Sequence, residues 1–140
     1  AMFRIGNTPL TVNYDGIMEL NNDMKIPVEC KFLSVYGAKY YNMSKQIMGN
    51  ELPMAYDLED LGDMVNGVYL TKRAAEAGIP IYYYTQLQQQ MLGLGAPFGY
   101  LTVLFDKDWE LKTFLVMADE QVQNKLLEVA KDTWMKIKPN

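Results

Sequence analysis

Hydrophobic and polar positions alternate with a period of two in several short segments of the chain. Successive side chains of a β-strand point to opposite sides, so this alternation predicts strands. Strands are predicted on this basis at 10–14, 17–20, 26–35, 100–105 and 111–117. In the clearest of them, 26–35, the apolar residues Val28, Cys30 and Phe32 share one side. We expect this side to be buried, with Cys30 as a small hydrophobic residue of the interior.

Helical spacing of apolar residues follows in the second half of the chain. It predicts a helix at 82–94, a partly helical segment at 61–77, and a last helix whose N-cap is Asp119. The segment 36–60 shows poor periodicity and is expected to contain loops with a short helix. The predicted fold class is therefore α/β (α+β), with a central mixed β-sheet flanked by helices. The chain has 140 residues, a length that suits a single domain spanning 1–140.

Composition excludes several classes of chemistry. Hydrophobic residues make up 49% and charged residues 21%, and the net charge is −4, as in ordinary globular proteins. The chain has no histidine and one cysteine, which excludes a Ser-His-Asp triad, a His-ligated zinc site and an internal disulfide. A reducing cytoplasm is the expected location, since no signal peptide and no apolar run of roughly 18 residues is visible.

Two acidic residues and a lysine form the candidate reaction centre. Asp15 lies at the end of the predicted strand 10–14, from which 17–20 is expected to return as the second strand of a hairpin. Glu29 and Lys31 fall on the same side of the strand 26–35. Carboxylates hold divalent cations through oxygen, and a nearby ammonium group can stabilise developing phosphate charge. The backbone carbonyl of Cys30 could be a further oxygen ligand. The alternative stays open at this point, because Asp-Gly is a common turn and any half-exposed strand alternates in this way.

A second motif lies in the predicted helix 82–94, where Tyr83-x-x-Gln86-x-Gln88 precedes a strand. With Glu29-Cys30-Lys31 upstream, this order resembles the YqaJ-type viral recombinase family, whose relatives include lambda exonuclease. The family belongs to the PD-(D/E)xK nuclease superfamily. The resemblance runs from about residue 15 to residue 134. The Glu-x-Lys part is generic, whereas the tyrosine–glutamine helix in this position is fairly specific.

The resemblance implies a restriction-endonuclease-like core. In it, Asp15 and Glu29 would be metal ligands and Lys31 the catalytic lysine. Gln86 would contact the metal's water shell or a DNA phosphate. It further implies Mg²⁺ or Mn²⁺ as cofactor, DNA as partner, and a homo-oligomer or a recombination partner protein. Candidate DNA contacts are Tyr83, Gln88 and Lys39. The resemblance places such a protein in a bacterial or phage-infected cell. Without the motif, a glutamine-rich helix side would be interpreted as solvated, and neighbouring tyrosines as packing residues.

One departure from the family concerns the N-terminal side. Family members carry a further helical region there with another acidic residue, whereas only fourteen residues precede Asp15. We expect a metal-dependent DNA nuclease, an exonuclease of phage-type recombination or DNA processing. The alternatives are a non-catalytic binding or inhibitory module that keeps the nuclease fold, and a fragment whose missing ligand lies in another chain. Tyr40-Tyr41 could in addition stack on unpaired bases.

Overall fold

The computed structural model describes residues 2–6, 10–20, 23–33, 37–46, 68–106 and 109–137. Four strands form one mixed sheet in the order β3-β4-β5-β6: β3 (Gly16–Glu19), β4 (Lys25–Leu33), β5 (Phe98–Phe105) and β6 (Leu111–Met117). Strands β3 and β4 pair antiparallel, β4 and β5 parallel, and β5 and β6 antiparallel. Two further strands, β1 (Met2–Arg4) and β2 (Thr11–Asn13), pair with each other only.

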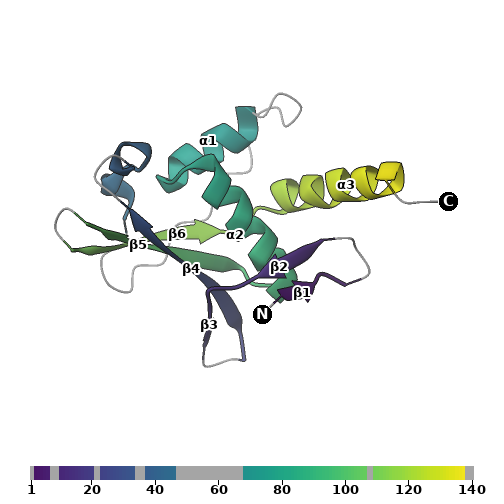
Figure 1. Ribbon diagram of the computed structural model, residues 1–140, viewed down its shortest axis with the longest axis horizontal. Coiled ribbons are helices and arrows are strands. Elements are labelled where there is room, and N and C mark those ends of the chain that lie inside the picture. Colours follow the sequence, from purple (N-terminus) through teal and green to yellow (C-terminus); the bar gives the residue numbers. More distant parts are fainter. Residues whose placement is uncertain are drawn as a thin grey trace.

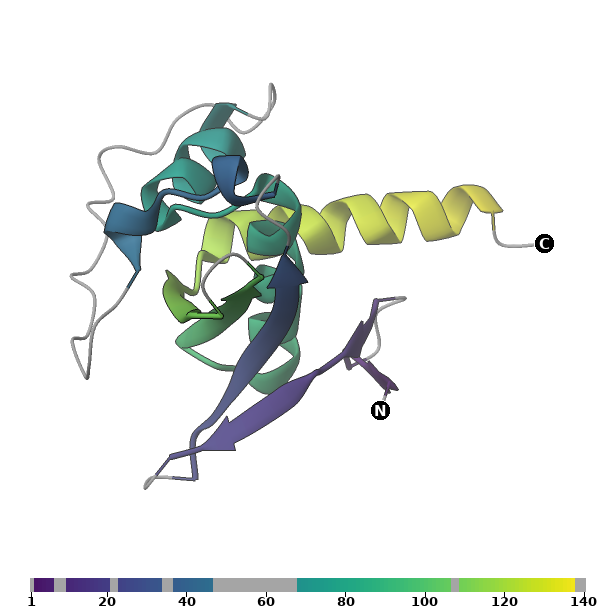
Figure 2. The ribbon, with the colours of Figure 1, turned by 60° about the vertical axis from the view of Figure 1, so that its left-hand side comes forward.

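The helical elements are η1 (Ala38–Tyr40), η2 (Met43–Lys45), α1 (Val68–Ala77), α2 (Ile81–Leu94) and α3 (Glu120–Ile137). Parallel neighbours such as β4 and β5 need a long crossover, and the chain segment that contains α1 and α2 provides it. Helix α2 lies across β4 and β5, with α1 beside it (Figure 1). Figure 2 shows the β3–β4 hairpin projecting from the helices, and α3 extending beyond the sheet. Among the described helices, none is long and apolar enough to cross a membrane.

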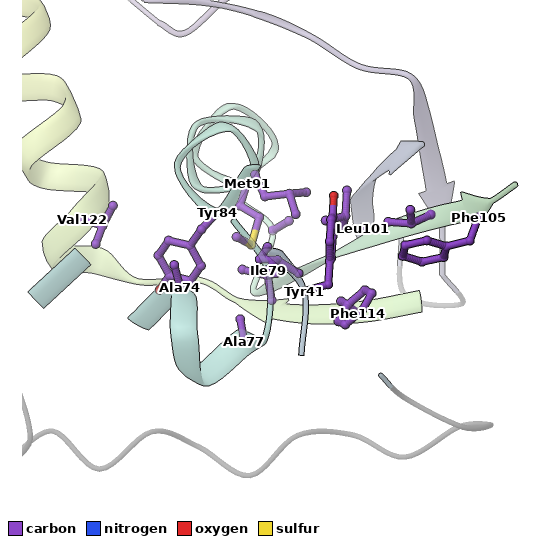
Figure 3. Close-up of a cluster of buried hydrophobic side chains, with 14 residues drawn as sticks. Tyr41, Ala74, Ala77, Ile79, Tyr84, Met91, Leu101, Phe105, Phe114 and Val122 are labelled. Atoms are coloured by element: carbon purple, nitrogen blue, oxygen red, sulfur yellow. The ribbon is translucent and has the colours of Figure 1, made fainter. Parts of the chain in front are cut away.

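The hydrophobic core lies between one face of the sheet and the helices (Figure 3). In β5 every second residue is buried, and these residues meet the buried side of α2. Residues at the centre of this cluster with no exposed surface are Tyr84, Leu87, Met91, Leu101, Val103, Phe114 and Val116. This packing fixes α2 against the sheet, and it therefore fixes any polar side chain that α2 directs toward β4.

Polar groups define the ends of the helices. The predicted N-cap of α3 is confirmed, because Asp119 Oδ1 accepts a hydrogen bond from the Val122 amide at 3.2 Å. The other Asp119 oxygen accepts one from the Tyr84 hydroxyl at 3.2 Å and lies 3.7 Å from the buried Arg73 guanidinium. Gly95 ends α2 with a φ of 64°, a left-handed conformation that glycine adopts without strain. Asp119 thus ties α1, α2 and α3 together.

Most of the predicted secondary structure is confirmed where the structure describes it. The predicted hairpin between 10–14 and 17–20 is wrong, because β2 pairs with β1 and β3 pairs with β4. The strands at 10–14, 17–20, 26–33, 100–105 and 111–117 and the helices at 68–77, 82–94 and after 119 are present, with shifts of one or two residues at their ends. The prediction missed β1. Its remaining parts, at 34–36, 47–60 and 61–67, lie outside the described residues. The mixed α/β class with helices packed on a mixed sheet is confirmed.

The predicted orientation of β4 is wrong. Cys30 is exposed and Phe32 is 61% exposed, whereas Glu29 is only 2% exposed. The alternation was identified correctly, but α2 covers the side that carries the charged residues. This side is buried because α2 supplies hydrogen-bond donors for the carboxylate, as described next.

Candidate active site

Glu29 is the centre of the candidate site. Its carboxylate lies in the middle of β4 beneath α2 and accepts hydrogen bonds on both oxygens. Oε1 accepts from Lys31 Nζ at 2.9 Å and from Gln86 Nε2 at 3.1 Å, and Oε2 accepts from Gln90 Nε2 at 2.7 Å. Burying a carboxylate is costly unless it is paired and hydrogen-bonded. These three donors compensate the burial and hold the Glu29 carboxylate in one orientation.

Helix α2 places its donors through helical spacing. Gln86 follows Tyr83 by three residues and Gln90 follows Gln86 by four, so all three fall on one side of the helix. The Gln90 side chain also donates to the backbone carbonyl of Asn13 at 2.9 Å. The backbone carbonyl of Gln90 accepts a hydrogen bond from the Tyr14 hydroxyl at 3.1 Å. The same residue therefore joins the candidate site to the segment that leads from β2 to β3.

Asp15 reaches the site at the edge of β4. Its Oδ2 accepts a hydrogen bond from the Cys30 amide at 3.0 Å, just before β3 begins its pairing with β4 at Gly16 and Val28. In an extended strand the amide and carbonyl of one residue point to the same side. The Cys30 carbonyl therefore faces the same edge as Asp15. Asp15 therefore lies beside the backbone of Cys30, the residue that follows Glu29 in β4.

Lys31 connects the carboxylates to an aromatic ring. Its amine lies 4.9 Å from the centre of the Tyr83 ring, a cation–π distance, besides its contact with Glu29. Burial acts to lower the pKa of Lys31, but the hydrogen bond to Glu29 and the negative charges of Glu29 and Asp15 outweigh it and raise this pKa. With 26% of its side chain exposed, the charged amine lies at the boundary between the buried carboxylate and solvent.

Two buried oxygen atoms beside Glu29 accept no hydrogen bond: Oε1 of Gln86 and Oε1 of Gln90. Their orientation follows from the carboxylate, because each amide must turn its NH₂ group toward Glu29. An unsatisfied buried acceptor costs about 1–3 kcal/mol, unless a cation or an ordered water meets it. Carboxylate, amide and backbone oxygens are the ligands that Mg²⁺ and Ca²⁺ use.

The donor set fits one hard cation better than a pair. Within the described residues no group of three or more His, Cys, Asp or Glu side chains could hold a metal ion. Asp15 and Glu29 are the two carboxylates available at this place, and the remaining oxygens are neutral amide and backbone groups. A single Mg²⁺ or Mn²⁺ ion bound by these residues would take water for most of its shell.

Two of the predicted DNA contacts lie apart from this centre. Gln88 has no exposed surface, and it donates to the Met117 carbonyl at 2.8 Å while its Oε1 accepts from the Asp119 amide at 2.8 Å. A side chain in this position cannot touch DNA, so the prediction for Gln88 is corrected: it fastens α2 to the β6–α3 connection. Lys39 is exposed on η1, with its amine 5.1 Å from the centre of the Tyr40 ring.

The sequence-based prediction did not assign a role to Gln90, although Gln90 makes the shortest contact with Glu29. The available signal was its spacing, one helical turn after Gln86 and on the same side. The interpretation of the glutamine-rich side as solvated is wrong for Gln88 and Gln90, which are 0% and 1% exposed.

Comparison of the chain with models of protein families, with curated protein sequences and with solved structures finds no match.

Proposed function

We propose that the chain is a divalent-metal-dependent DNA nuclease built on a restriction-endonuclease-like core, an exonuclease of phage-type recombination or DNA processing. The observation that carries the proposal is the buried Glu29 carboxylate, in contact with Lys31 and Gln86. Asp15 lies at the amide of the residue between Glu29 and Lys31. Lys31, Gln86 and Glu29 are thus in direct contact, and Asp15 adjoins them through the backbone of Cys30.

The chemistry follows from the oxygen donors and the lysine. A bound Mg²⁺ or Mn²⁺ would supply a water of lowered pKa and polarise the phosphate. Asp15, Glu29 and the Cys30 carbonyl would hold the ion. Lys31 would donate a hydrogen bond to the attacking water or to a phosphate oxygen, where negative charge increases in the transition state. Gln86 would orient water or phosphate through its amide.

The surroundings of Lys31 raise its pKa rather than lower it, so the amine remains a charged hydrogen-bond donor as an ordinary lysine is. Glu29 would have to exchange part of its hydrogen bonding for the cation. Lys31 and Gln86 share Oε1, so one oxygen can be released while Gln90 continues to hold Oε2. The two unsatisfied amide oxygens would then have a positive partner close by.

The test is degradation of linear double-stranded DNA with Mg²⁺ or Mn²⁺, together with Mn²⁺ binding measured by calorimetry. We expect Glu29→Ala to lose both metal binding and cleavage, and Lys31→Ala to lose cleavage while still binding Mn²⁺. Exposed residues on the same hairpin give matched controls, namely Glu19→Ala and Lys25→Ala, which should behave as wild type. Cleavage by Lys31→Ala at the wild-type rate would show that the assigned role is wrong.

A second candidate is a non-catalytic binding or inhibitory module on the same fold. The observation in its favour is that protein donors already occupy both oxygens of Glu29, as in a purely structural carboxylate. The same calorimetry separates the two functions. A chain that binds no Mn²⁺ and cleaves no DNA, but keeps its far-ultraviolet circular dichroism, is the non-catalytic module.

A further inference from the structure

An aromatic hollow of about 380 Å³ lies beside the reaction centre, next to η1 and the start of α2. It is lined by four tyrosines: Tyr40, Tyr41, Tyr82 and Tyr83. Two of these rings are largely open to solvent, with Tyr40 63% and Tyr82 71% exposed. Leucine, glycine and proline complete the lining, and none of the lining residues is charged.

A second hollow of about 540 Å³ lies on the other side of Tyr82, which lines both. Its polar lining comes from β2 and α2, including Asn13, Thr85, Gln86 and Gln89. These side chains are hydroxyls and amides, so we call this the amide-lined hollow. The rest of its lining is apolar or aromatic, and no lining residue is charged. Both volumes lie in the range of about 300–1,000 Å³ that is usual for small-molecule sites. Both hollows are thus uncharged although the net charge of the chain is −4.

The candidate reaction centre adjoins both hollows. Tyr83 of the aromatic hollow lies under the Lys31 amine, and Lys31 contacts Glu29. Gln86 of the amide-lined hollow donates to the same Glu29 oxygen. A ligand that filled both hollows would cross Tyr82, whose ring contacts that of Tyr83 beside Lys31.

An unpaired nucleic-acid strand alternates uncharged bases with charged phosphates, which matches two uncharged hollows next to a lysine. Its bases are uncharged, planar and able to stack on tyrosine, and each pair of bases is separated by a charged phosphate. A duplex keeps its bases stacked inside and presents phosphates to a protein. We infer that the two hollows bind unpaired bases on either side of Tyr82, with the phosphate that joins them directed toward Lys31, so that the substrate is a single strand or an opened DNA end. This inference names the substrate class and rests on the proposed nuclease function.

A proline-rich peptide is the other occupant that an aromatic hollow can take. Three features favour the unpaired strand. The hollow opens beside Lys31, a cation in contact with the candidate reaction centre. A second cation, Lys39, lies over the Tyr40 ring. The amide-lined hollow across Tyr82 provides hydrogen-bonding groups suited to base edges, for which a polyproline helix has no donors.

Binding is tested separately from cleavage, with a fluorescein-labelled oligothymidylate, Ca²⁺ in place of Mg²⁺, and fluorescence anisotropy. Removal of a stacking ring by Tyr82→Ala or Tyr40→Ala should weaken binding by roughly 5- to 150-fold, and Tyr82→Phe and Tyr40→Phe should retain it. Both tyrosines are exposed, so these variants should fold. Trp109→Ala removes a ring that is 69% exposed and lines neither hollow, and it should bind as wild type.

Cleavage assays then distinguish failure of this inference from failure of the nuclease proposal. Under the inference, wild type degrades single strands and frayed ends faster than blunt duplex, and Tyr82→Ala raises KM for single strands. Cleavage that depends on Glu29 but not on Tyr82 or Tyr40 overturns the inference and leaves the nuclease proposal intact. Tyrosine-dependent binding of oligothymidylate without any cleavage overturns the nuclease proposal alone. Binding of a proline-rich peptide at the tyrosines, with no oligothymidylate binding, overturns the inference.

Discussion

Gln90 is the residue whose removal best tests the network around Glu29. Gln90→Ala removes a 2.7 Å hydrogen bond to a carboxylate and a 2.9 Å hydrogen bond to the Asn13 carbonyl. Hydrogen bonds to charged groups contribute about 1.5–3 kcal/mol and neutral ones about 0.5–1.5 kcal/mol. Loss of one buried methylene group adds about 0.8 kcal/mol, and relief of the unsatisfied Oε1 returns about 1–3 kcal/mol. The expected loss in unfolding free energy is therefore about 2 kcal/mol.

Gln86→Ala is the matched comparison on the same side of α2. Gln86 makes one hydrogen bond to Glu29 and is only partly buried, so water can replace it, and the expected loss is about 1 kcal/mol. Urea unfolding followed by far-ultraviolet circular dichroism is the appropriate assay, because Trp109 and Trp134 are both exposed and report weakly on the core.

A double-mutant cycle isolates the contact itself. In a Glu29→Ala background, Gln90→Ala should cost less than in wild type, by about 1.5–3 kcal/mol. Equal losses for the two glutamine variants, together with a coupling energy below about 0.5 kcal/mol, would refute the arrangement in which Gln90 holds the carboxylate.

Three further outcomes are expected. Gly99→Ala should destabilise the fold by about 1–3 kcal/mol, because a Cβ there would lie 3.1 Å from a ring atom of Pro27 in β4. Gly16→Ala should be tolerated, because its Cβ would lie 3.8 Å from the nearest atom. Equal urea midpoints for the two variants would refute this packing. The pKa of Lys31 is raised, so its charged form contributes stability at neutral and mildly alkaline pH, below the unfolded value of about 10.4, and this contribution is lost as the pH rises through the higher folded value. The difference in stability from Lys31→Ala should then be constant between about pH 6 and 9 and decrease above about pH 10.5, and a decrease already near neutral pH would contradict it. Cys30 should react with a thiol reagent in the folded protein, and reaction only after denaturation would contradict its exposed position.

Local sequence signals were sufficient for most of the secondary structure. Period-two alternation located the strands, and the Asp119 cap and the glycine after residue 94 located helix ends, because these signals depend only on neighbouring residues. Alternation also showed that Glu29 and Lys31 share a side of β4. It could not show which side is buried, because that depends on a helix more than fifty residues away. The usual rule that apolar residues face inward gave the wrong answer for Cys30 and Phe32.

Buried glutamines were the second point that the sequence left undetermined. Gln86, Gln88 and Gln90 look alike in sequence, yet the structure gives each a different partner: Gln86 and Gln90 bind Glu29, and Gln88 binds the connection before α3. Helical geometry explains the division, since residues two apart point to opposite sides whereas residues four apart share one. The side that meets β4 could be deduced only after the position of Glu29 beneath α2 was known.

The cost of this polar network is itself informative about its role. A buried ion pair can often be replaced by apolar residues of similar volume with no loss of stability, or with a gain. The double variant Glu29→Met/Gln90→Leu removes the buried charge and both of its hydrogen-bonding oxygens, and it leaves Lys31 and Gln86 free to turn to solvent. We expect this variant to unfold at a urea concentration equal to or above that of wild type while losing Mn²⁺ binding and cleavage. If its urea midpoint lies far below that of wild type, the network is needed for the fold. This result would favour a structural role for Glu29 over a catalytic one.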